Sequence, residues 1–444
     1  MVLTTQESTG QPYLVVSSDS HAGPSLERSL RPYCPAEFLE TFDDFTRGVR
    51  EQQFLRRERD DQLSHADRAM QNIIFVKDEH LSAEQIEARQ RTFDCPGHDD
   101  FAARLAAMDA DGVAAEVIFA GGQNREVTPF VGFGADAGPA GVDPRLRAVG
   151  EQIWNRWLAD ACSIAPERLL GVIQVPIWDL DAAIEEMAAG RERGLTVVNL
   201  PAPRADLVPY NDPVYERFWA ACEDLDMTLA THTGGGEAPL GFQAADGSHL
   251  PGGALIYQYE RFWLTRRHLW QLMFGGVFDR HPKLRVVFTE QMVSWVAPTL
   301  ADLDNVYHQE SIGWYAIDSK PARTPSEYWA TNCFNGGSFL APHEADMRHD
   351  VGVDRLMWGT DYPHMEGTWP NTMASIRNTF AHVPEDDTRR ILGENAVSAY
   401  HLDAKALRPV ADRIGPTPQA VAVPLAPEEI PAIRGRAFRT FENF

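Results

Sequence analysis

The stretch LDAAIEEMAAGRERGLTVVNLPA, residues 180–202, combines two patterns in a fixed order. Apolar residues recur at helical spacing through residues 180–194, and Gly194 supplies the glycine that commonly ends a helix. The run at 196–202 is short and apolar and includes β-branched residues, which is typical of a buried strand. The stretch therefore predicts a helix that leads directly into a strand.

The same helix-to-strand unit recurs along most of the chain. Apolar runs predict strands at residues 13–18, 114–120, 169–175, 196–202, 227–235, 284–290 and 354–363, and a further strand is placed near 328–334. Repeats of this kind give parallel strands joined by crossover helices, and about eight of them close an α/β fold of the (β/α)8 TIM barrel type. A doubly wound open sheet is the alternative, although no GxGxxG motif follows the first strand.

Two segments fall outside this alternation. Residues 30–95 are rich in Arg, Gln and Asp with scattered aromatic residues, and we expect a helical insertion after the first strand that serves as a lid or a subunit contact. Residues 405–444 carry repeated Pro and Ala, so we expect an extended C-terminal arm. The barrel, with its insertion, is therefore expected to span residues 10–404.

Composition excludes several classes of partner. The chain has 444 residues and a formal net charge of −24, which argues against a nucleic-acid partner because such binding needs clustered Lys and Arg. The five cysteines form no CxxC pair, and neither a signal peptide nor a run of membrane-spanning length is evident. We expect a cytoplasmic enzyme with a small-molecule substrate. The insertion and the arm favour a homo-oligomer, with a hetero-oligomer of related barrels as the alternative.

Carboxylates and imidazoles close four of the predicted strands. They are Asp19 and His21 on the first strand, His232 after residues 227–231, Glu290 after 284–289, and Asp361 with His364 three positions later. In a parallel barrel the carboxyl ends of the strands meet at one rim, where the chemistry of these folds gathers. Imidazole and carboxylate together suit a divalent transition metal: zinc is expected first, with iron or manganese as alternatives.

Several segments carry a family resemblance. SSDSHAG (17–23), DFAARLAAMDADGVAAEVIF (100–119), LATHTGGG (229–236), FGGVFDRHPKLRVVFTEQMVSWV (274–296) and DRLMWGTDYPHMEGTWP (354–370) together resemble the amidohydrolase-related family. This is the branch of the amidohydrolase superfamily that includes aminocarboxymuconate-semialdehyde decarboxylase. The resemblance runs in order from about residue 13 to 403 and implies a distorted (β/α)8 barrel. It also implies one divalent metal held by Asp19, His21, His232 and Asp361.

The chain departs from the family pattern at two positions. Glu290 stands at the end of the sixth strand, where decarboxylases and typical hydrolases of the family often carry a histidine. Asn199 ends the fourth strand, where dinuclear members of the wider superfamily often carry a bridging lysine. A lysine-bridged metal pair is therefore not expected, and a second metal would need Glu290 or another carboxylate as its bridge.

Three reactions are compatible with these residues. We expect first a hydrolase of an ester, lactone or amide, in which a metal-activated water reacts, Asp361 transfers protons, Glu290 is a second acid or base, and His364 orients Asp361 or contacts the substrate.

The first alternative is non-oxidative decarboxylation of a carboxylated aromatic or muconate-like substrate. Arg125 would then bind the carboxylate, and the absence of the sixth-strand histidine counts against this reaction. The second alternative is a dinuclear non-haem iron or iron–manganese oxygenase, or its partner subunit, favoured by the carboxylates Asp19, Glu290 and Asp361.

Overall fold

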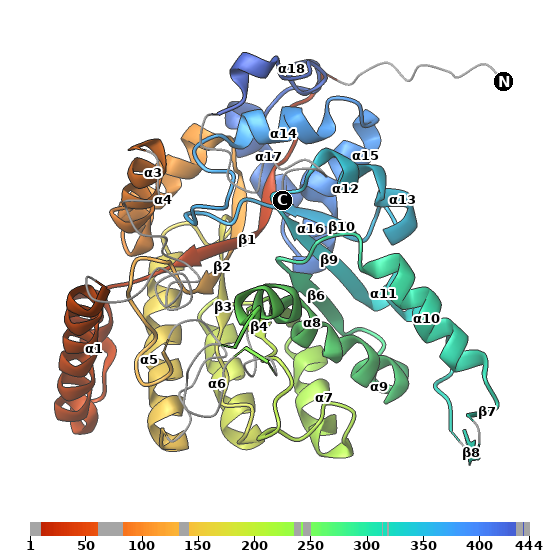
Figure 1. The fold of residues 1–444 in the computed structure, drawn as a ribbon, viewed down its shortest axis with the longest axis horizontal. Helices are drawn as coiled ribbons and strands as arrows, with labels where there is room; N and C mark the ends of the chain where they lie inside the picture. Colours follow the sequence, from red (N-terminus) through yellow and green to blue (C-terminus); the bar gives the residue numbers. More distant parts are fainter. Residues whose placement is uncertain are drawn as a thin grey trace.

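Eight parallel strands form the centre of the molecule (Figure 1). The computed structural model describes residues 10–60, 83–132, 142–234, 241–242, 250–312, 314–317, 319–431 and 438. In the sheet the strands follow the order β1-β2-β3-β4-β5-β6-β9-β10. Their bounds are β1 Val16–Ala22, β2 Ala115–Ala120, β3 Leu169–Ile173, β4 Val197–Asn199, β5 Thr228–His232, β6 Arg285–Thr289, β9 Cys333–Ser338 and β10 Leu356–Gly359.

The two outer strands of this order, β1 and β10, meet and close the ring. Ser20 forms a parallel bridge with Tyr362, just beyond β10, and the amide of His21 donates to the Tyr362 carbonyl at 2.6 Å. The amide of Asp361 donates in turn to the carbonyl of Asp19 at 3.0 Å. The predicted (β/α)8 barrel is confirmed.

Helices surround the barrel. The longer ones that follow or precede barrel strands are α4 Phe101–Asp111, α5 Pro144–Cys162, α6 Leu180–Glu192, α7 Glu216–Asp224, α8 Gly253–Phe274, α10 Val296–His308, α11 Pro325–Asn332 and α14 Thr372–Phe380. Shorter ones are α9 Val277–Arg280, α12 Pro342–Asp346, α13 Arg348–Val351, α15 Glu385–Arg389 and α16 Asn395–Tyr400. None of the described helices is both long enough and apolar enough to cross a bilayer.

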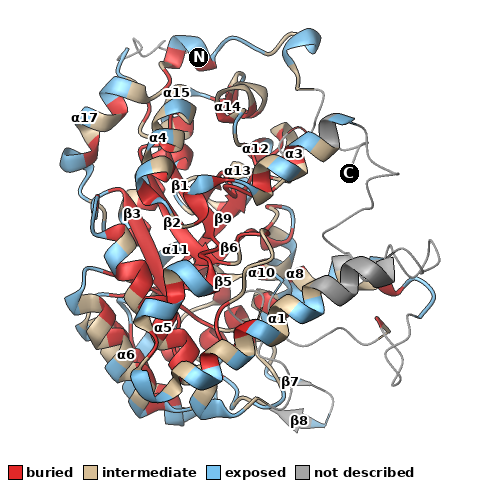
Figure 2. Cartoon of the chain, turned by 90° about the vertical axis from the view of Figure 1, so that its left-hand side faces the viewer, coloured by how far each residue is buried: buried red, intermediate tan, exposed pale blue. Residues whose placement is uncertain are grey.

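Burial follows the expected two-layer pattern. Figure 2 shows the strands buried at the centre and the helices exposed on their outer faces. The barrel interior is filled by small and branched side chains from successive strands, including Val16, Val117, Val172, Val197 and Val287. Because a parallel barrel is covered on its outer face as well, its strands read as nearly continuous apolar runs, and this is why the sequence located them.

The insertion after β1 is helical where the structure describes it. It contains α1 Leu39–Asp60, which Figure 1 places at the edge of the molecule, and α3 Ala83–Phe93. Short helical turns flank them: η1 Leu26–Leu30, η2 Arg31–Tyr33, η3 Ala36–Phe38 and η5 Pro96–His98. Residues 61–82 of the predicted insertion lie outside the described part of the chain.

The strand expected near residues 328–334 is misplaced. Most of that segment belongs to α11, and β9 begins only at Cys333. The helix starts with a reciprocal cap in which the Thr324 side chain binds the Glu327 amide while Glu327 binds back to residue 324, and Pro325 occupies the first turn. The true strand, CFNGGS, contains two glycines and so lacks the β-branched signal of a strand.

The extended arm expected from residue 405 is wrong for its first part. Helix α17 Ala404–Ile414 begins there, capped by the Asp403 side chain, and α18 Pro418–Val421 and η8 Pro427–Glu429 follow. Leu407 is fully buried against the end of the barrel beside Tyr400. Tertiary packing of this apolar face stabilises the helix in spite of the prolines. Residues 432–437 and 439–444 of the arm are not described.

Candidate metal centre

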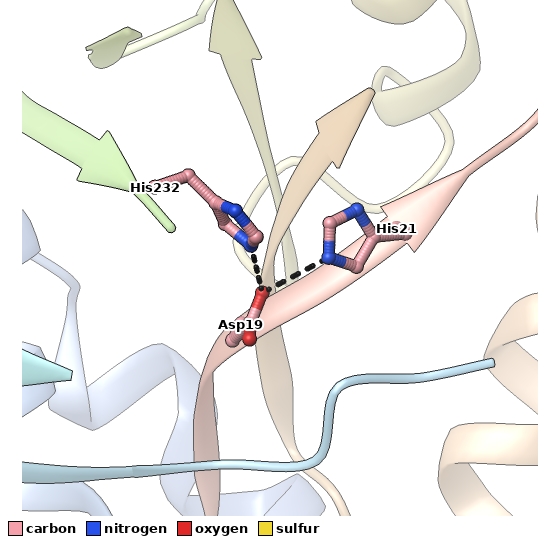
Figure 3. Close-up of side chains that lie close together, drawn as sticks. All are labelled: Asp19, His21 and His232. Carbon is pink, nitrogen blue, oxygen red and sulfur yellow. Dashed lines mark hydrogen bonds and ion pairs between the residues drawn. The ribbon is translucent and has the colours of Figure 1, made fainter. Parts of the chain in front are cut away.

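Three of the predicted ligands meet at the carboxyl ends of β1 and β5 (Figure 3). One oxygen of Asp19, Oδ1, lies 3.4 Å from Nε2 of His21 and 3.3 Å from Nε2 of His232. Asp19 is fully buried and His21 nearly so. The positions i and i+2 of β1 therefore face the same point, as expected for neighbouring side chains on one face of a strand.

Asp361 joins the cluster from the loop after β10. Its Oδ1 atom lies 3.3 Å from Nε2 of His21 and 2.8 Å from Nδ1 of His364. Among the described residues, Oδ2 of Asp361 has no hydrogen-bond partner, although Asp361 is fully buried. Buried polar atoms without partners are rare in proteins and call for an explanation. A divalent cation between these two carboxylates and two imidazoles would satisfy them, so the side chains present fit such an ion.

The charged groups of the cluster shift one another's pKa values. Burial disfavours the ionised form of Asp19, but the charges of His232 and His21 and their hydrogen bonds outweigh it and hold the pKa of Asp19 well below its usual range. Burial likewise disfavours protonated His232, yet the Asp19 carboxylate raises its pKa to about 9. The surroundings of Asp19 therefore favour an anionic carboxylate that faces positive charge.

His364 is held between Asp361 and the backbone. Its Nε2 atom lies 2.7 Å from the carbonyl of Gly121, and its ring stacks on that of His21 with centroids 4.0 Å apart. Burial opposes protonation, but the charge of Asp361 and its hydrogen bond raise the pKa of His364 to about 10. Asp361 feels the converse effect: burial is outweighed by His364, and its pKa is lowered.

Glu290 lies beside the cluster at the end of β6. Its Oε2 atom is 3.9 Å from Nε2 of His232. Burial and the nearby charge of Asp361 raise the pKa of Glu290 to about 7. Both Glu290 and Asp361 have positive φ angles, 54° and 56°, a backbone conformation that side chains with a Cβ rarely adopt. The turn after each strand thus directs a carboxylate into the cluster.

Sequence reasoning missed Ser338 and Glu366, which lie beside the carboxylates of the site. The Ser338 hydroxyl, at the end of β9, donates a short hydrogen bond to Oδ2 of Asp19. It was missed because that strand was placed too early. Glu366 groups with Glu290 and Asp361 so that one oxygen of each lies within 4.8 Å of the others, and it accepts a hydrogen bond from Gln123 at 3.0 Å. Its only signal was its proximity to His364 in sequence.

Two arginines are relevant to a negatively charged ligand. Arg125, the predicted substrate-binding residue, has its guanidinium carbon 4.9 Å from the ring centre of Phe93 in the insertion. Arg261 of α8 was not predicted. Its Nε atom is buried and has no hydrogen-bond partner in the part of the chain that the structure describes. Its carbonyl faces the Thr233 hydroxyl at 3.5 Å, and its charge acts to lower the pKa of Glu290. Arg261 therefore lies close to the cluster.

Comparison with known proteins places the chain in a family. The chain is 27% identical over 320 residues to gamma-resorcylate decarboxylase from Rhizobium radiobacter, covering 68% of this chain and 87% of that one. It is 28% identical over 271 residues to the enzyme of the same name from Rhodococcus jostii (strain RHA1), covering 56% and 75%.

The fold also matches a solved structure of 5-carboxyvanillate decarboxylase from Novosphingobium aromaticivorans in complex with manganese and 4-hydroxy-3-methoxy-5-nitrobenzoic acid. The TM-score is 0.60 at 18% identity, covering 90% of this chain and 100% of that one. The family model described as Amidohydrolase matches residues 75–402, well over half of the 444-residue chain. The chain belongs to the amidohydrolase family.

Proposed function

We propose that the protein is a metal-dependent decarboxylase that removes the carboxylate from a small carboxylated aromatic compound. The observation that carries the proposal is the match over 320 residues to gamma-resorcylate decarboxylase, combined with four metal-type ligands at the barrel rim. The hydrolase expected first from the sequence has less support, because both curated relatives named above are decarboxylases. The oxygenase alternative draws no support from these relatives.

Asp19, His21, His232 and Asp361 would hold the divalent ion. Manganese is the better-supported ion, since it is bound in the solved 5-carboxyvanillate decarboxylase, whereas zinc was expected from the sequence. When bound, such an ion supplies positive charge that binds and orients the oxygen atoms of the substrate. Ser338 fixes the direction of Asp19, and His364 does the same for Asp361 through its contact with the Gly121 carbonyl.

The reaction needs a proton at the ring carbon. The bond between that carbon and the carboxylate breaks, its electron pair remains on the ring carbon and takes up the proton, and carbon dioxide leaves. We assign the proton to Glu290 by its position. Asp19 and Asp361 would serve as metal ligands, and Glu366 accepts a hydrogen bond from Gln123. Glu290, by contrast, lies beside the cluster, 3.9 Å from His232.

A cation must also bind the substrate carboxylate. Arg261 is the better candidate because its buried Nε–H has no hydrogen-bond partner in the described structure and it lies near Glu290. An unpaired buried donor gains a strong, charge-assisted hydrogen bond when a carboxylate arrives. Arg125, expected from the sequence, remains a second candidate. The homo-oligomer, the lid function of the insertion and the cytoplasmic location stay predictions.

The test compares products across metals and substrates. Metal-free protein is loaded with Mn²⁺, Zn²⁺ or Fe²⁺ and assayed for carbon dioxide release from 2,6-dihydroxybenzoate and 5-carboxyvanillate, alongside ester, lactone and amide substrates and oxygen uptake. Asp361→Asn should abolish carbon dioxide release, and Asp412→Asn, at the surface of α17, should not. Hydrolysis or oxygen uptake that is lost in Asp361→Asn, without any carbon dioxide release by the parent protein, would overturn the proposal.

A further inference from the structure

Arg104 is a fully buried arginine on α4 that lies next to the candidate metal centre. A buried guanidinium is costly unless its N–H groups are paired. Here Nε donates a short bond to the buried carboxylate of Glu116 on β2, and Nη1 and Nη2 donate to three further acceptors. The Arg104 side chain is therefore well paired, and the positions of its acceptors show which segments it connects.

Two of these partners lie at the ligand-bearing end of β1. Nη1 donates to the carbonyl of His21 at 2.7 Å, and Nη2 donates to the hydroxyl of Ser20 at 2.8 Å. The Ser20 hydroxyl in turn donates a hydrogen bond to the carbonyl of Val117 on β2 at 2.7 Å. The backbone of the Asp19–His21 segment is thus fixed from the outside of the barrel, while the side chains of Asp19 and His21 face the cluster.

The guanidinium also joins β1 to two other segments. Nη1 donates to the carbonyl of Gly97, at the end of the insertion, at 3.0 Å. The guanidinium carbon lies 4.8 Å from the ring centre of Tyr362, the residue after Asp361, and the Tyr362 hydroxyl lies 2.8 Å from Sγ of Cys95. A Cβ at Gly97 would come within 2.2 Å of that hydroxyl, so the segments pack closely. Arg104 therefore contacts the His21 carbonyl, the Ser20 hydroxyl and the Tyr362 ring, which lie at or next to three of the four proposed ligands.

We propose that Arg104 is a positioning residue that aligns His21 and Asp361 for metal binding by tying the ends of β1 and β10 to each other and to the insertion. The planar fork of arginine suits this role because it donates in several fixed directions, whereas lysine is a compact charge without that geometry. Outer residues that orient metal ligands typically contribute about 10–100-fold to metal affinity. The inference rests on the metal site of the proposed function but not on the reaction.

The experiment measures Mn²⁺ affinity by titration, with free Mn²⁺ followed by electron paramagnetic resonance, and thermal unfolding of the metal-free protein. The variants are Arg104→Met and Arg104→Lys. The matched control is Arg168→Met, because Arg168 is also buried and binds the carbonyl of Ala114 and the carboxylate of Asp109, but at the amino-terminal end of β2.

We expect the affinity to fall at least about tenfold in Arg104→Met and less in Arg104→Lys. It should stay unchanged in Arg168→Met even where that variant unfolds at a lower temperature. Equal affinities in both folded methionine variants would overturn the inference, since Arg104 would then only stabilise the fold. If Arg104→Met does not fold, the test uses Arg104→Lys and Ser20→Ala. Mn²⁺ affinities within about twofold of the parent value in both variants would overturn the inference. A parent protein that binds no Mn²⁺, Zn²⁺ or Fe²⁺ overturns the proposed function as well.

Discussion

Replacing Ser338 by alanine tests whether the candidate metal centre is held in place by its hydrogen bonds. The Ser338 hydroxyl is the donor to Oδ2 of Asp19, while Oδ1 faces both imidazoles. A hydrogen bond to a charged group contributes about 1.5–3 kcal/mol, and removing its donor leaves a buried carboxylate oxygen unpaired. Since about 1.4 kcal/mol corresponds to a tenfold change, Ser338→Ala should weaken Mn²⁺ binding by about 10–100-fold.

Isothermal titration of the metal-free protein with Mn²⁺ measures this loss directly. Ser375→Ala is the matched control, because Ser375 on α14 is fully buried and its hydroxyl has no hydrogen-bond partner among the described residues. That variant should bind Mn²⁺ like the parent protein. A dissociation constant for Ser338→Ala within about twofold of the parent value would refute the reasoning, since Asp19 would then need no orienting donor.

Three further outcomes are expected. Burial raises the pKa of Asp111 to about 6. The free energy of unfolding therefore falls as the pH rises from about 4 to about 6, because the folded protein resists the ionisation of Asp111. Asp111→Asn keeps an acceptor for the Thr372 amide. It should raise the free energy of unfolding, measured by urea denaturation, by about 1–3 kcal/mol at pH 7.5 and by less at pH 4.5. An equal gain at both pH values would contradict this expectation. Arg261→Met should raise KM for a carboxylated aromatic by about tenfold or more with a smaller effect on kcat, whereas Arg267→Met, exposed on the same helix, should change neither in steady-state assays. Chelation of the metal should lower the melting temperature relative to protein in excess Mn²⁺, because free ion at about 100 times its dissociation constant stabilises by about 2.7 kcal/mol; identical calorimetric scans would argue against a metal site.

The barrel could be predicted from the sequence because its strands are buried on both faces. Runs such as residues 114–120 and 284–290 are short, apolar and preceded by amphipathic helices, so their type and order follow from local pattern. The position of strand β9 could not be predicted in this way, because its glycines have low strand propensity and the strand forms through pairing with β6 and β10. Helix α17 likewise depends on the surface against which Leu407 packs.

The candidate ligands were predictable for a different reason. Asp19, His21, His232 and Asp361 each follow an apolar run, and the topology of a parallel barrel brings the ends of such runs to one rim. Ser338 and Arg104 could not be found this way. Ser338 depends on the register of a misplaced strand, and Arg104 reaches the site from a helix through contacts with backbone carbonyls. Such contacts leave no pattern in a single sequence.

The left-handed backbone at Glu290 and Asp361 has a consequence for protein engineering. The cost is about 1–3 kcal/mol at Glu290 and smaller at Asp361, because aspartate adopts positive φ more readily than glutamate. Glycine at either position, or asparagine at 290, would relieve that cost. A screen that rewards heat resistance alone should therefore enrich these replacements and return robust but inert proteins, so directed evolution of this scaffold should hold both codons constant.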